Sequence, residues 1–317
     1  MRAVEISKPG GPGVLRVVER PTPEPKAGEV LVAIHAAGVS RADAMQRLGT
    51  YPPPPGASDI PGLECAGALG SGEPVCALLT GGGYAQYAAV PLEQLLPVPE
   101  NWSSLEAATL PENMFTVYDN LITRGRFERG QTVLVHGGTS GIGSTAIMLA
   151  RALGASFIAA TARSERKREQ CLSIGADLAI DSTKEDFVQR LASATGGRGV
   201  DIVVDIVGGD FIDRDLQALA FDGRIVCIAA AAAARVQIDL SKVLARRATI
   251  LGSSLRARTP AMKGVIAKAL LRDVWPLLPG KDAIRPLVDS VYPLEEAAAA
   301  HERLEQSAHF GKIVLSV

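Results

Sequence analysis

The sequence predicts an α/β protein with a doubly wound parallel sheet in its middle and β-rich segments before it. Three observations predict this fold. A strand pattern, a glycine-rich turn and a helix pattern follow one another between Thr132 and Gly154. Strand and helix patterns then alternate as far as Gly252, which favours parallel strands joined by right-handed crossovers. The residues from Val14 to Tyr87 show short β-rich runs separated by prolines instead.

The stretch from Thr132 to Gly154 has the composition of a phosphate-binding turn. The β-branched run Thr132–Val135 is typical of a buried strand, and apolar residues from Ile142 to Leu153 follow one helical face. Between the two lie Gly137, Gly138, Gly141 and Gly143. Glycines let the backbone approach a pyrophosphate, and the free N–H groups of the first helical turn bind its charge. We expect a dinucleotide here; a glycine-rich loop without a ligand is the alternative.

The other elements are predicted from local patterns. Strands are expected at 14–18, 29–34, 156–161, 178–180, 201–207, 224–229, 248–252 and 311–315. Helices are expected at 41–48, 104–108, 115–121, 165–174, 185–194, 211–220, 260–271 and 294–305. Ser40 is placed as the N-cap of the first of these helices. The proline run after Tyr51 predicts a stiff, extended loop, which either holds this tyrosine at the edge of a cleft or is only a rigid connector.

Composition excludes several classes of function. The chain has 317 residues, enough for two domains, with 47% hydrophobic and 21% charged residues and a formal net charge of −1. This charge gives no reason to expect a nucleic acid or an anionic membrane as the partner. The first residues lack an apolar signal core, and the longest uncharged apolar run, 225–234, is too short to span a bilayer. We expect a cytoplasmic protein.

The four cysteines predict neither a disulfide framework nor a metal site. They lie far apart and form no C-x-x-C pair, whereas a structural metal site needs tighter grouping. We expect buried free thiols in a reducing compartment.

The end of the second strand of the alternating region indicates which dinucleotide is bound. NAD-binding domains usually carry Asp or Glu there, which binds the ribose 2′-hydroxyl. Here the strand is followed by Arg163, Ser164 and Lys167. Charge-assisted donors of this kind suit a 2′-phosphate. We predict NADPH as the cofactor, with a solvated charge cluster diluted by Glu165 as the alternative.

Two families of dehydrogenases use such a glycine turn. Short-chain dehydrogenases need a Tyr-x-x-x-Lys motif, and none of the five tyrosines here has a lysine at that spacing, so that family is excluded. Over nearly its whole length the chain resembles the medium-chain dehydrogenase/reductase superfamily, in its quinone oxidoreductase (zeta-crystallin-like) branch, closest to the tumour-suppressor-inducible group. The motifs that carry the resemblance are at 8–12, 28–32, 37–43, 51–58, 77–83, 110–112, 223–224 and 311–315.

This resemblance implies a split architecture. A Rossmann NADP-binding domain, residues 115–254, is expected to be inserted into a GroES-like β-barrel domain formed by residues 1–114 and 255–317. A homodimer is also implied, in which the strand near Thr249–Ser253 extends the sheet of its partner.

The resemblance further implies a reductase that works without zinc. Zinc-dependent relatives have Cys at the position of Ser40 and His at that of Leu63, and neither Ser nor Leu supplies the ligand that a catalytic zinc requires. Without this Lewis acid an alcohol is hard to dehydrogenate, whereas hydride transfer to an electron-poor quinone or conjugated enone needs no metal. The implied activity is NADPH:quinone oxidoreductase. A 2-alkenal or enone reductase and a cofactor-binding protein without turnover are the alternatives.

Site residues are carried over from the family by position. Tyr51 matches a tyrosine at the substrate mouth, where its phenol donates a proton to the product oxygen; an exposed phenol without a role is the alternative. Ser140 matches a functional serine of the pyrophosphate turn. The residues expected to bind the cofactor are Ser40, Thr116, Gly137, Gly138, Ser140, Gly141, Ile142, Arg163, Ser164, Lys167, Ser182, Ser253, Leu255 and Lys312.

The chain departs from the family at four places. Ser40 stands where many relatives have Asn, and Ser182 where some have a Tyr that contacts the 2′-phosphate, so we expect Lys167 to carry NADPH affinity. Segment 67–75 is shorter than the family's equivalent hairpin, and the alanine run 229–234 replaces a bulkier loop.

Overall fold

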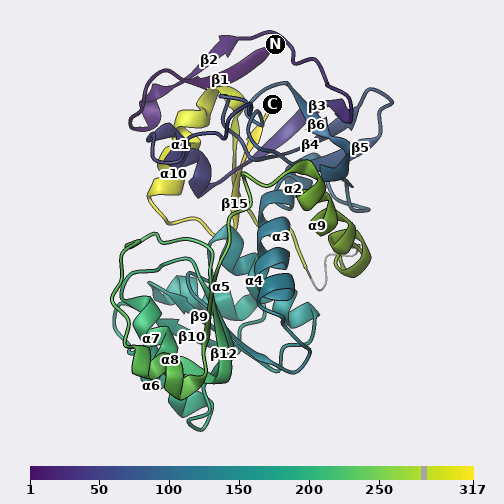
Figure 1. Ribbon diagram of the computed structural model, residues 1–317. Coiled ribbons are helices and arrows are strands. Elements are labelled where there is room, and N and C mark those ends of the chain that lie inside the picture. The colour runs from purple at the N-terminus through teal and green to yellow at the C-terminus, as the bar shows by residue number, and fades with distance from the viewer. Residues whose placement is uncertain (280–283) are drawn as a thin grey trace. The chain divides into compact units, whose positions relative to one another are not determined.

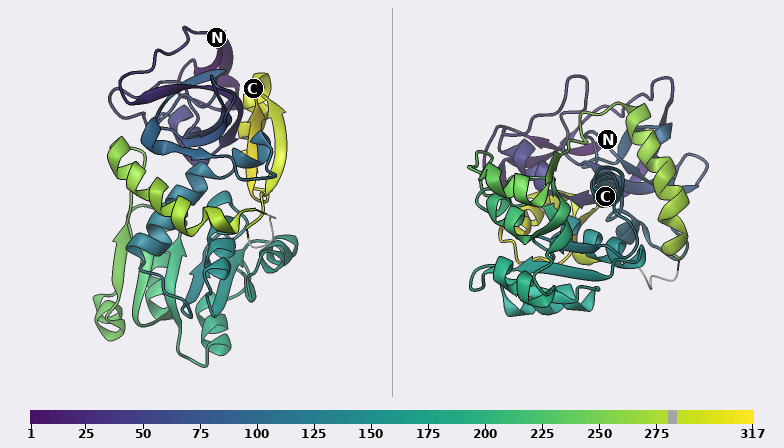
Figure 2. Two further views of the ribbon diagram at one scale, coloured as in Figure 1. Left: turned by 90° about the vertical axis from the view of Figure 1, so that its right-hand side faces the viewer. Right: turned by 60° about the horizontal axis from the view of Figure 1, so that its bottom comes forward.

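The computed structural model describes residues 1–279 and 284–317 and divides the chain into two compact units. Unit 1 consists of Met1–Phe115 and Leu255–Val317, and unit 2 of Thr116–Ser254. Figures 1 and 2 show that each unit contains a sheet of strands lying side by side. None of the helices described is long and apolar enough to cross a membrane.

Unit 2 contains a six-stranded, fully parallel sheet in the order β10-β9-β8-β11-β12-β13. The strands are β8 (Thr132–Val135), β9 (Phe157–Ala162), β10 (Leu178–Asp181), β11 (Val200–Asp205), β12 (Leu219–Cys227) and β13 (Thr249–Gly252). Strand order runs outward in both directions from the neighbours β8 and β11, which defines a doubly wound sheet and opens a crevice at their carboxyl ends. The predicted fold class is confirmed.

Helices lie on both faces of this sheet (Figure 1). They are α4 (Gly141–Ala152), α5 (Glu165–Ser173), α6 (Phe187–Ala194), α7 (Phe211–Ala218) and α8 (Leu240–Arg246). Helices α6, α7 and α8 pack together, while α4 packs on β8 and β9. The core between sheet and helices includes Leu134, Phe187 and Leu216, all fully buried. Because both faces are covered, the strands read as continuous apolar runs.

Three predicted element bounds in unit 2 are wrong. The helix expected at 115–121 begins at Pro111 as α3 (Pro111–Val117), where proline suits the first helical position, and continues as a π-helix, η3 (Tyr118–Arg124). Helix α7 ends before Leu219, because Leu219 already pairs with Val200 in the sheet. Helix α8 has no counterpart among the predictions, since its exposed Leu240 and Leu244 give no inward-facing apolar stripe.

Unit 1 contains a seven-stranded sheet in the order β14-β15-β3-β4-β5-β7, with β6 also paired to β3. All pairs are antiparallel except β14 with β15. The strands are β3 (Glu29–Val39), β4 (Glu64–Leu69), β5 (Pro74–Leu78), β6 (Tyr87–Pro91), β7 (Leu95–Pro97), β14 (Val288–Pro293) and β15 (Lys312–Ser316); β1 (Arg2–Ile6) and β2 (Leu15–Glu19) form a separate pair. The shortened 67–75 segment is the tight β4–β5 hairpin.

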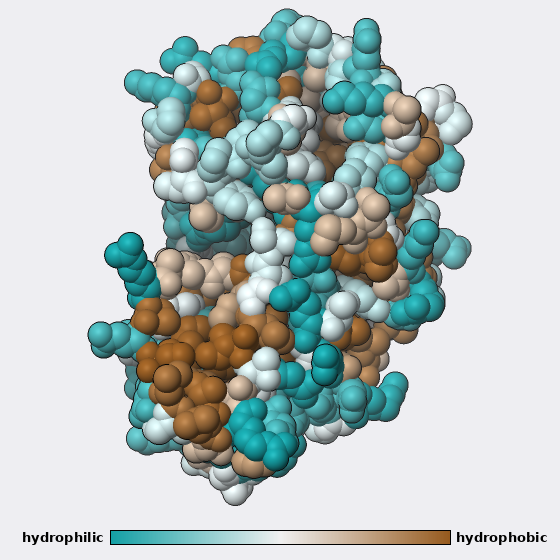
Figure 3. Space-filling model, viewed as in Figure 1, coloured by the Kyte–Doolittle hydropathy of each residue, from teal (hydrophilic) through white to brown (hydrophobic). Residues whose placement is uncertain are grey.

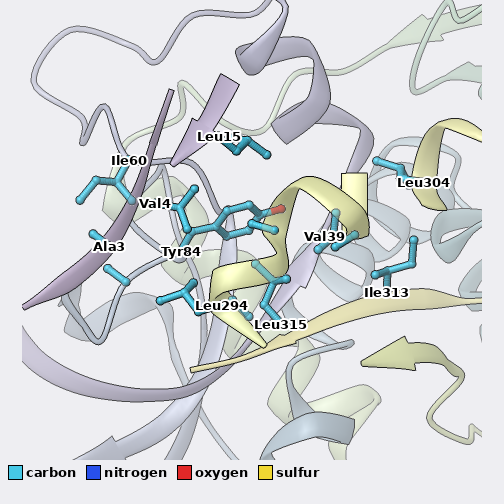
Figure 4. Packing of buried hydrophobic residues seen from close by; sticks show 14 of the residues in the cluster. Ala3, Val4, Leu15, Val39, Ile60, Tyr84, Leu294, Leu304, Ile313 and Leu315 are labelled. Carbon is cyan, nitrogen blue, oxygen red and sulfur yellow. The ribbon is translucent and has the colours of Figure 1, made fainter. Parts of the chain in front are cut away.

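Four helices complete unit 1: α1 (Arg41–Arg47), α2 (Ser104–Ala107), α9 (Pro260–Asp273) and α10 (Ala297–Glu305). Short 3-10 turns η1 (Pro12–Val14), η2 (Leu92–Gln94), η4 (Trp275–Leu277) and η5 (Leu294–Glu296) join neighbouring elements. Figure 4 shows the ring of Tyr84 packed among aliphatic side chains such as Val4 and Leu315, which come from both ends of the chain. The first and last segments therefore share one core.

The cysteines are all free. Cys65, Cys76 and Cys171 are buried as predicted, whereas Cys227 is half-buried at the end of β12. Burial raises the pKa of the Cys65 and Cys171 thiols to about 12, which makes them unreactive.

Candidate cofactor and substrate site

The glycine turn lies between β8 and α4, at the carboxyl edge of the parallel sheet. Ser140 is the N-cap of α4: its Oγ accepts from the Gly143 N–H at 3.0 Å and donates to the Gly137 carbonyl at 2.9 Å. Gly137 has a φ of +66°, a conformation that glycine adopts without strain. A single hydroxyl thus closes the turn onto itself, next to the helical N–H groups that bind anions.

Close packing beneath the turn explains two more of its glycines. A Cβ atom on Gly143 would lie 2.3 Å from the Gly137 carbonyl oxygen, and one on Gly138 would lie 2.7 Å from the Cys171 sulfur. Both distances are far below van der Waals contact, so no side chain fits without movement of the backbone or of α5. Steric packing therefore explains why glycine stands at positions 138 and 143.

A buried polar network supports the turn from behind, and the sequence patterns did not reveal it. His136 lies between Thr161 Oγ1 at 3.0 Å from its Nδ1 and Asp215 Oδ1 at 2.8 Å from its Nε2. Thr161 Oγ1 also accepts from the Gly137 N–H at 3.2 Å. Burial raises the pKa of Asp215, and His136 opposes this rise. The one available signal was a polar residue, His136, between an apolar strand and the first turn glycine.

The predicted 2′-phosphate residues are brought together at the carboxyl ends of β9 and β10. Arg163 is exposed and makes no hydrogen bond or ion pair with any described residue. Ser164 is the N-cap of α5 and accepts from the Lys167 N–H. Ser182 joins them, since its N–H donates to the Ala162 carbonyl at 2.9 Å. This end of the sheet therefore presents the exposed guanidinium of Arg163 beside the hydroxyls of Ser164 and Ser182.

Thr116 and Ser253, predicted on the nicotinamide side, lie in unit 2. The π-helix η3 contacts Thr116 itself and Gly252, the residue before Ser253. The carbonyl of Thr116, in α3, accepts from Nδ2 of Asn120, in the π-helix η3, at 2.8 Å. Arg124, at the end of η3, donates to the carbonyl of Gly252, the residue before Ser253, at 2.6 Å. π-Helical turns occur frequently at functional sites.

The alanine run 229–234 folds back on the turn after β11. The Ala232 N–H donates to the Val207 carbonyl at 2.8 Å, and the Gly209 N–H donates to the Ala233 carbonyl at 3.0 Å. Gly208 lies so close that a Cβ there would meet Ala230. A side chain at Gly208 would therefore collide with this loop, whose residues 230–234 are themselves exposed.

Unit 1 carries the other predicted residues: Ser40, Tyr51, Leu255 and Lys312. Ser40 caps α1 as predicted, in a capping box with Asp43: the Asp43 N–H donates to Ser40 Oγ, and Asp43 Oδ2 accepts from the Ser40 N–H at 2.8 Å and from Ser40 Oγ at 2.9 Å. The Ser40 hydroxyl is thus engaged locally. Leu255 is half-buried at the start of the returning segment.

Tyr51 is half-buried just beyond α1, and its N–H donates to the Met45 carbonyl at 3.2 Å. Arg256, which the sequence reasoning did not select, donates to the Tyr51 carbonyl at 3.2 Å and lies 5.3 Å from the centroid of its ring. Tyr51 is therefore held by the residue that follows Leu255. The only sequence signal was an arginine adjoining a predicted cofactor residue.

Lys312, predicted to bind the cofactor, lies in a buried cluster of charged side chains. Its ammonium is buried, forms an ion pair with Glu64 and lies 3.5 Å from Glu112 Oε2. These partners raise the pKa of Lys312 even though burial opposes them. Burial chiefly raises the pKa of the Glu64 carboxyl to about 7, with Glu112 adding to this and Lys312 opposing it. Because both carboxylates take up its charge, Lys312 holds β15 to β4.

The described residues include no group of three or more His, Cys, Asp or Glu side chains placed to hold a metal ion. At the positions that the sequence comparison selected, Ser40 caps a helix and Leu63 is a buried aliphatic side chain. Neither offers a nitrogen or sulfur ligand.

The doubly wound sheet with its glycine turn defines a dinucleotide-binding α/β protein. A family model described as zinc-binding dehydrogenase matches residues 141–270. Quinone oxidoreductase from Rattus norvegicus is 30% identical over 328 residues, which cover 99% of this chain and 97% of that protein.

Solved structures agree with this comparison. The quinone oxidoreductase from Thermus thermophilus, determined also in complex with NADPH, has a TM-score of 0.86 and 34% identity, with all of both chains covered. The Escherichia coli quinone oxidoreductase complexed with NADPH has a TM-score of 0.86 and 28% identity, again with both chains fully covered. The chain belongs to the medium-chain dehydrogenase/reductase superfamily, in the group of the quinone oxidoreductases.

Proposed function

We propose that this protein is a zinc-independent, cytoplasmic NADPH:quinone oxidoreductase. The observation that carries the proposal is the glycine turn capped by Ser140, followed at the next strand end by Arg163, Ser164 and Lys167 in place of an acidic residue. Full-length likeness to quinone oxidoreductases solved with NADPH supports it. The absence of Cys and His at positions 40 and 63 supports a reaction without zinc.

Each residue group has a separate task in this proposal. The turn N–H groups after Gly137 bind the pyrophosphate, and Arg163 and Lys167 bind the 2′-phosphate. Bound NADPH supplies a hydride to the electron-poor acceptor. Tyr51 donates its phenolic proton to the oxygen that becomes negative as the acceptor is reduced. Thr116, Ser253 and Leu255 position the nicotinamide end.

The activity test compares acceptors and cofactors in one panel. The purified protein is assayed for NADPH and NADH oxidation with 1,2-naphthoquinone, other quinones and short 2-alkenals. We expect turnover with quinones and a preference for NADPH. Faster turnover with the alkenals would favour the enone reductase, and background rates with all acceptors would favour a binding protein without turnover.

The cofactor preference has its own variant. Arg163→Ala is expected to raise the KM for NADPH about tenfold and to leave that for NADH unchanged, because only NADPH carries the 2′-phosphate. Arg166→Ala, an exposed arginine three residues closer to the middle of α5, is the matched control and should change neither KM. Equal effects of Arg163→Ala on the two cofactors would contradict the assigned role.

We also propose a homodimer formed through unit 2. Strand β13 is an edge of the parallel sheet, so one side of its backbone is unpaired within the described residues. Figure 3 shows hydrophobic side chains gathered on the surface of unit 2; Val236, Leu240, Leu244 and Ile250 are 41%, 66%, 77% and 39% exposed. An exposed apolar patch beside an open strand edge suits a second copy of this chain. Leu244→Asp should convert dimer to monomer in sedimentation, and an unchanged dimer would contradict this interface.

A further inference from the structure

The segment after Leu255 contains two buried cations that form no ion pair with any described carboxylate. Arg256 is 5% exposed and Lys263, in α9, is 1% exposed. Burial, together with the charges of Arg256 and Arg258, lowers the pKa of Lys263 to about 8. Buried unpaired cations are costly, and such an arrangement is more frequent at functional sites than elsewhere.

The Arg256 guanidinium joins three segments that are distant in sequence. It donates from Nε to the Thr80 carbonyl at 3.0 Å, from Nη1 to the Tyr51 carbonyl at 3.2 Å and from Nη2 to Gln46 Oε1 at 2.6 Å. Gln46 in turn donates to the Asp59 carbonyl at 2.9 Å. One planar side chain therefore fixes both ends of the proline loop that begins at Tyr51.

Lys263 binds the backbone of Arg256. Its ammonium donates to the Arg256 carbonyl at 3.0 Å and to Thr80 Oγ1 at 2.8 Å. Both cations thus use neutral oxygens as acceptors, which leaves their positive charge largely unneutralised. Burial lowers the pKa of Arg256, and the charge of Asp43, buried in α1, opposes this shift.

The Tyr51 ring lies within this positive field. Arg256 Cζ is 5.3 Å from the ring centroid, a distance at which a cation and an aromatic face attract each other. The same guanidinium binds the Tyr51 carbonyl, so backbone and ring are held by one group.

We propose that Arg256 is a positioning residue for reduction: it fixes the backbone and the ring of Tyr51 so that the phenol can act as the proton donor. This inference rests on the proposed function of Tyr51. The acceptor gains a hydride from NADPH, the Tyr51 O–H bond breaks and its proton goes to the acceptor oxygen. NADPH is oxidised, the quinone is reduced to hydroquinone, and solvent returns a proton to Tyr51.

The test is a double-mutant cycle between Arg256→Met and Tyr51→Phe, with quinone and NADPH as substrates. Arg256→Met alone is expected to lower kcat about 10- to 100-fold, within the usual contribution of a general acid. In the Tyr51→Phe background the same change should lower kcat less than about threefold, because the group that Arg256 acts through is already gone. Arg256→Lys, which keeps the charge without the planar fork, should recover part of the loss.

Arg47→Met is the matched control for loss of a buried arginine. Arg47 is fully buried in unit 1 and binds the Gly10 carbonyl, His301 and Glu305, with no contact to Tyr51. Assayed below its melting temperature, it should retain kcat. A readout independent of activity is hydrogen–deuterium exchange of residues 50–58 without cofactor, which should accelerate in Arg256→Met and not in Arg47→Met.

The outcomes separate this inference from the proposed function. If the wild type reduces quinones while Arg256→Met and Arg47→Met lose equal activity, or the Tyr51 and Arg256 effects multiply independently, the positioning role is wrong and the reductase stands. If the wild type reduces no quinone, the proposed function fails, and the exchange measurement still decides whether Arg256 holds the Tyr51 loop.

Discussion

The glycine turn of unit 2 and the charged clusters of unit 1 are built in opposite ways. In the turn, residues from Gly137 to Gly143 come from one continuous stretch, and their contacts are made by backbone groups and by the hydroxyls of Ser140 and Thr161. The clusters around Arg256 and Lys312 join side chains separated by more than a hundred residues, such as Arg256 with Gln46 and Lys312 with Glu64. The turn holds no buried charge, whereas the clusters depend on it.

This difference teaches where each kind of site is sensitive. A backbone cradle tolerates changes of charge nearby but not of volume, because its neighbours are in contact. A buried charged cluster tolerates little change of charge, because a lost partner leaves the other ion without solvent or counterion. Substitutions that change volume in the turn or charge in the clusters therefore test this comparison.

The largest effect on stability is expected from Lys312→Met. The change leaves the buried Glu64 and the half-buried Glu112 without their cation, and breaking a buried pair costs about 3–5 kcal/mol in the free energy of unfolding. Chemical denaturation measures the loss. Arg247→Met, which removes an exposed ion pair with Asp222, is the surface control and should change stability little. Similar losses in both variants would show that the buried cluster has no special weight.

The same cluster predicts a pH dependence. The pKa of Glu64 is about 7 in the folded protein, above its ordinary 4.5. The folded state therefore binds this proton more tightly, so the contribution of Glu64 to stability is most favourable below 4.5 and declines as the pH rises to about 7. Between pH 5 and pH 8 we expect wild-type stability to fall relative to Glu64→Gln by about 1–3 kcal/mol. Parallel curves for the two proteins would contradict this assignment.

A smaller loss of stability, with a large loss of cofactor binding, is expected from Gly143→Ala. The added Cβ would lie 2.3 Å from the Gly137 carbonyl oxygen and would displace the turn. Overpacking of this kind costs about 1–3 kcal/mol. NADPH binding, followed by its fluorescence, should weaken more than stability suggests. Gly70→Ala, at an open position in the β4–β5 turn, should change neither quantity.

The smallest effect is expected from Ser140→Ala. Loss of the N-cap hydrogen bond to the Gly143 N–H costs about 1 kcal/mol. Ser103→Ala removes an equivalent cap from α2 in unit 1 and should lose similar stability without weakening NADPH binding. If both variants bind NADPH as the wild type does, Ser140 is only a helix cap.

The amino-acid sequence by itself determined the parallel sheet, the glycine turn, the Ser40 cap of α1 and the basic strand end at Arg163. Each depends on residues that lie close together in the chain, so periodicity, glycine spacing and capping preference reveal it. The π-helix after Thr116 was not predicted, because its register differs from the common helix by one residue per turn.

Only the tertiary structure decided which buried polar groups meet. It placed His136 against Asp215, Arg256 against Tyr51 and Lys312 against Glu64. The ion pair of Lys312 was not predicted for this reason: the sequence of a terminal strand does not show which carboxylates lie opposite its lysine. Such pairs are selected by desolvation inside a folded core, and that environment exists only after distant segments have packed.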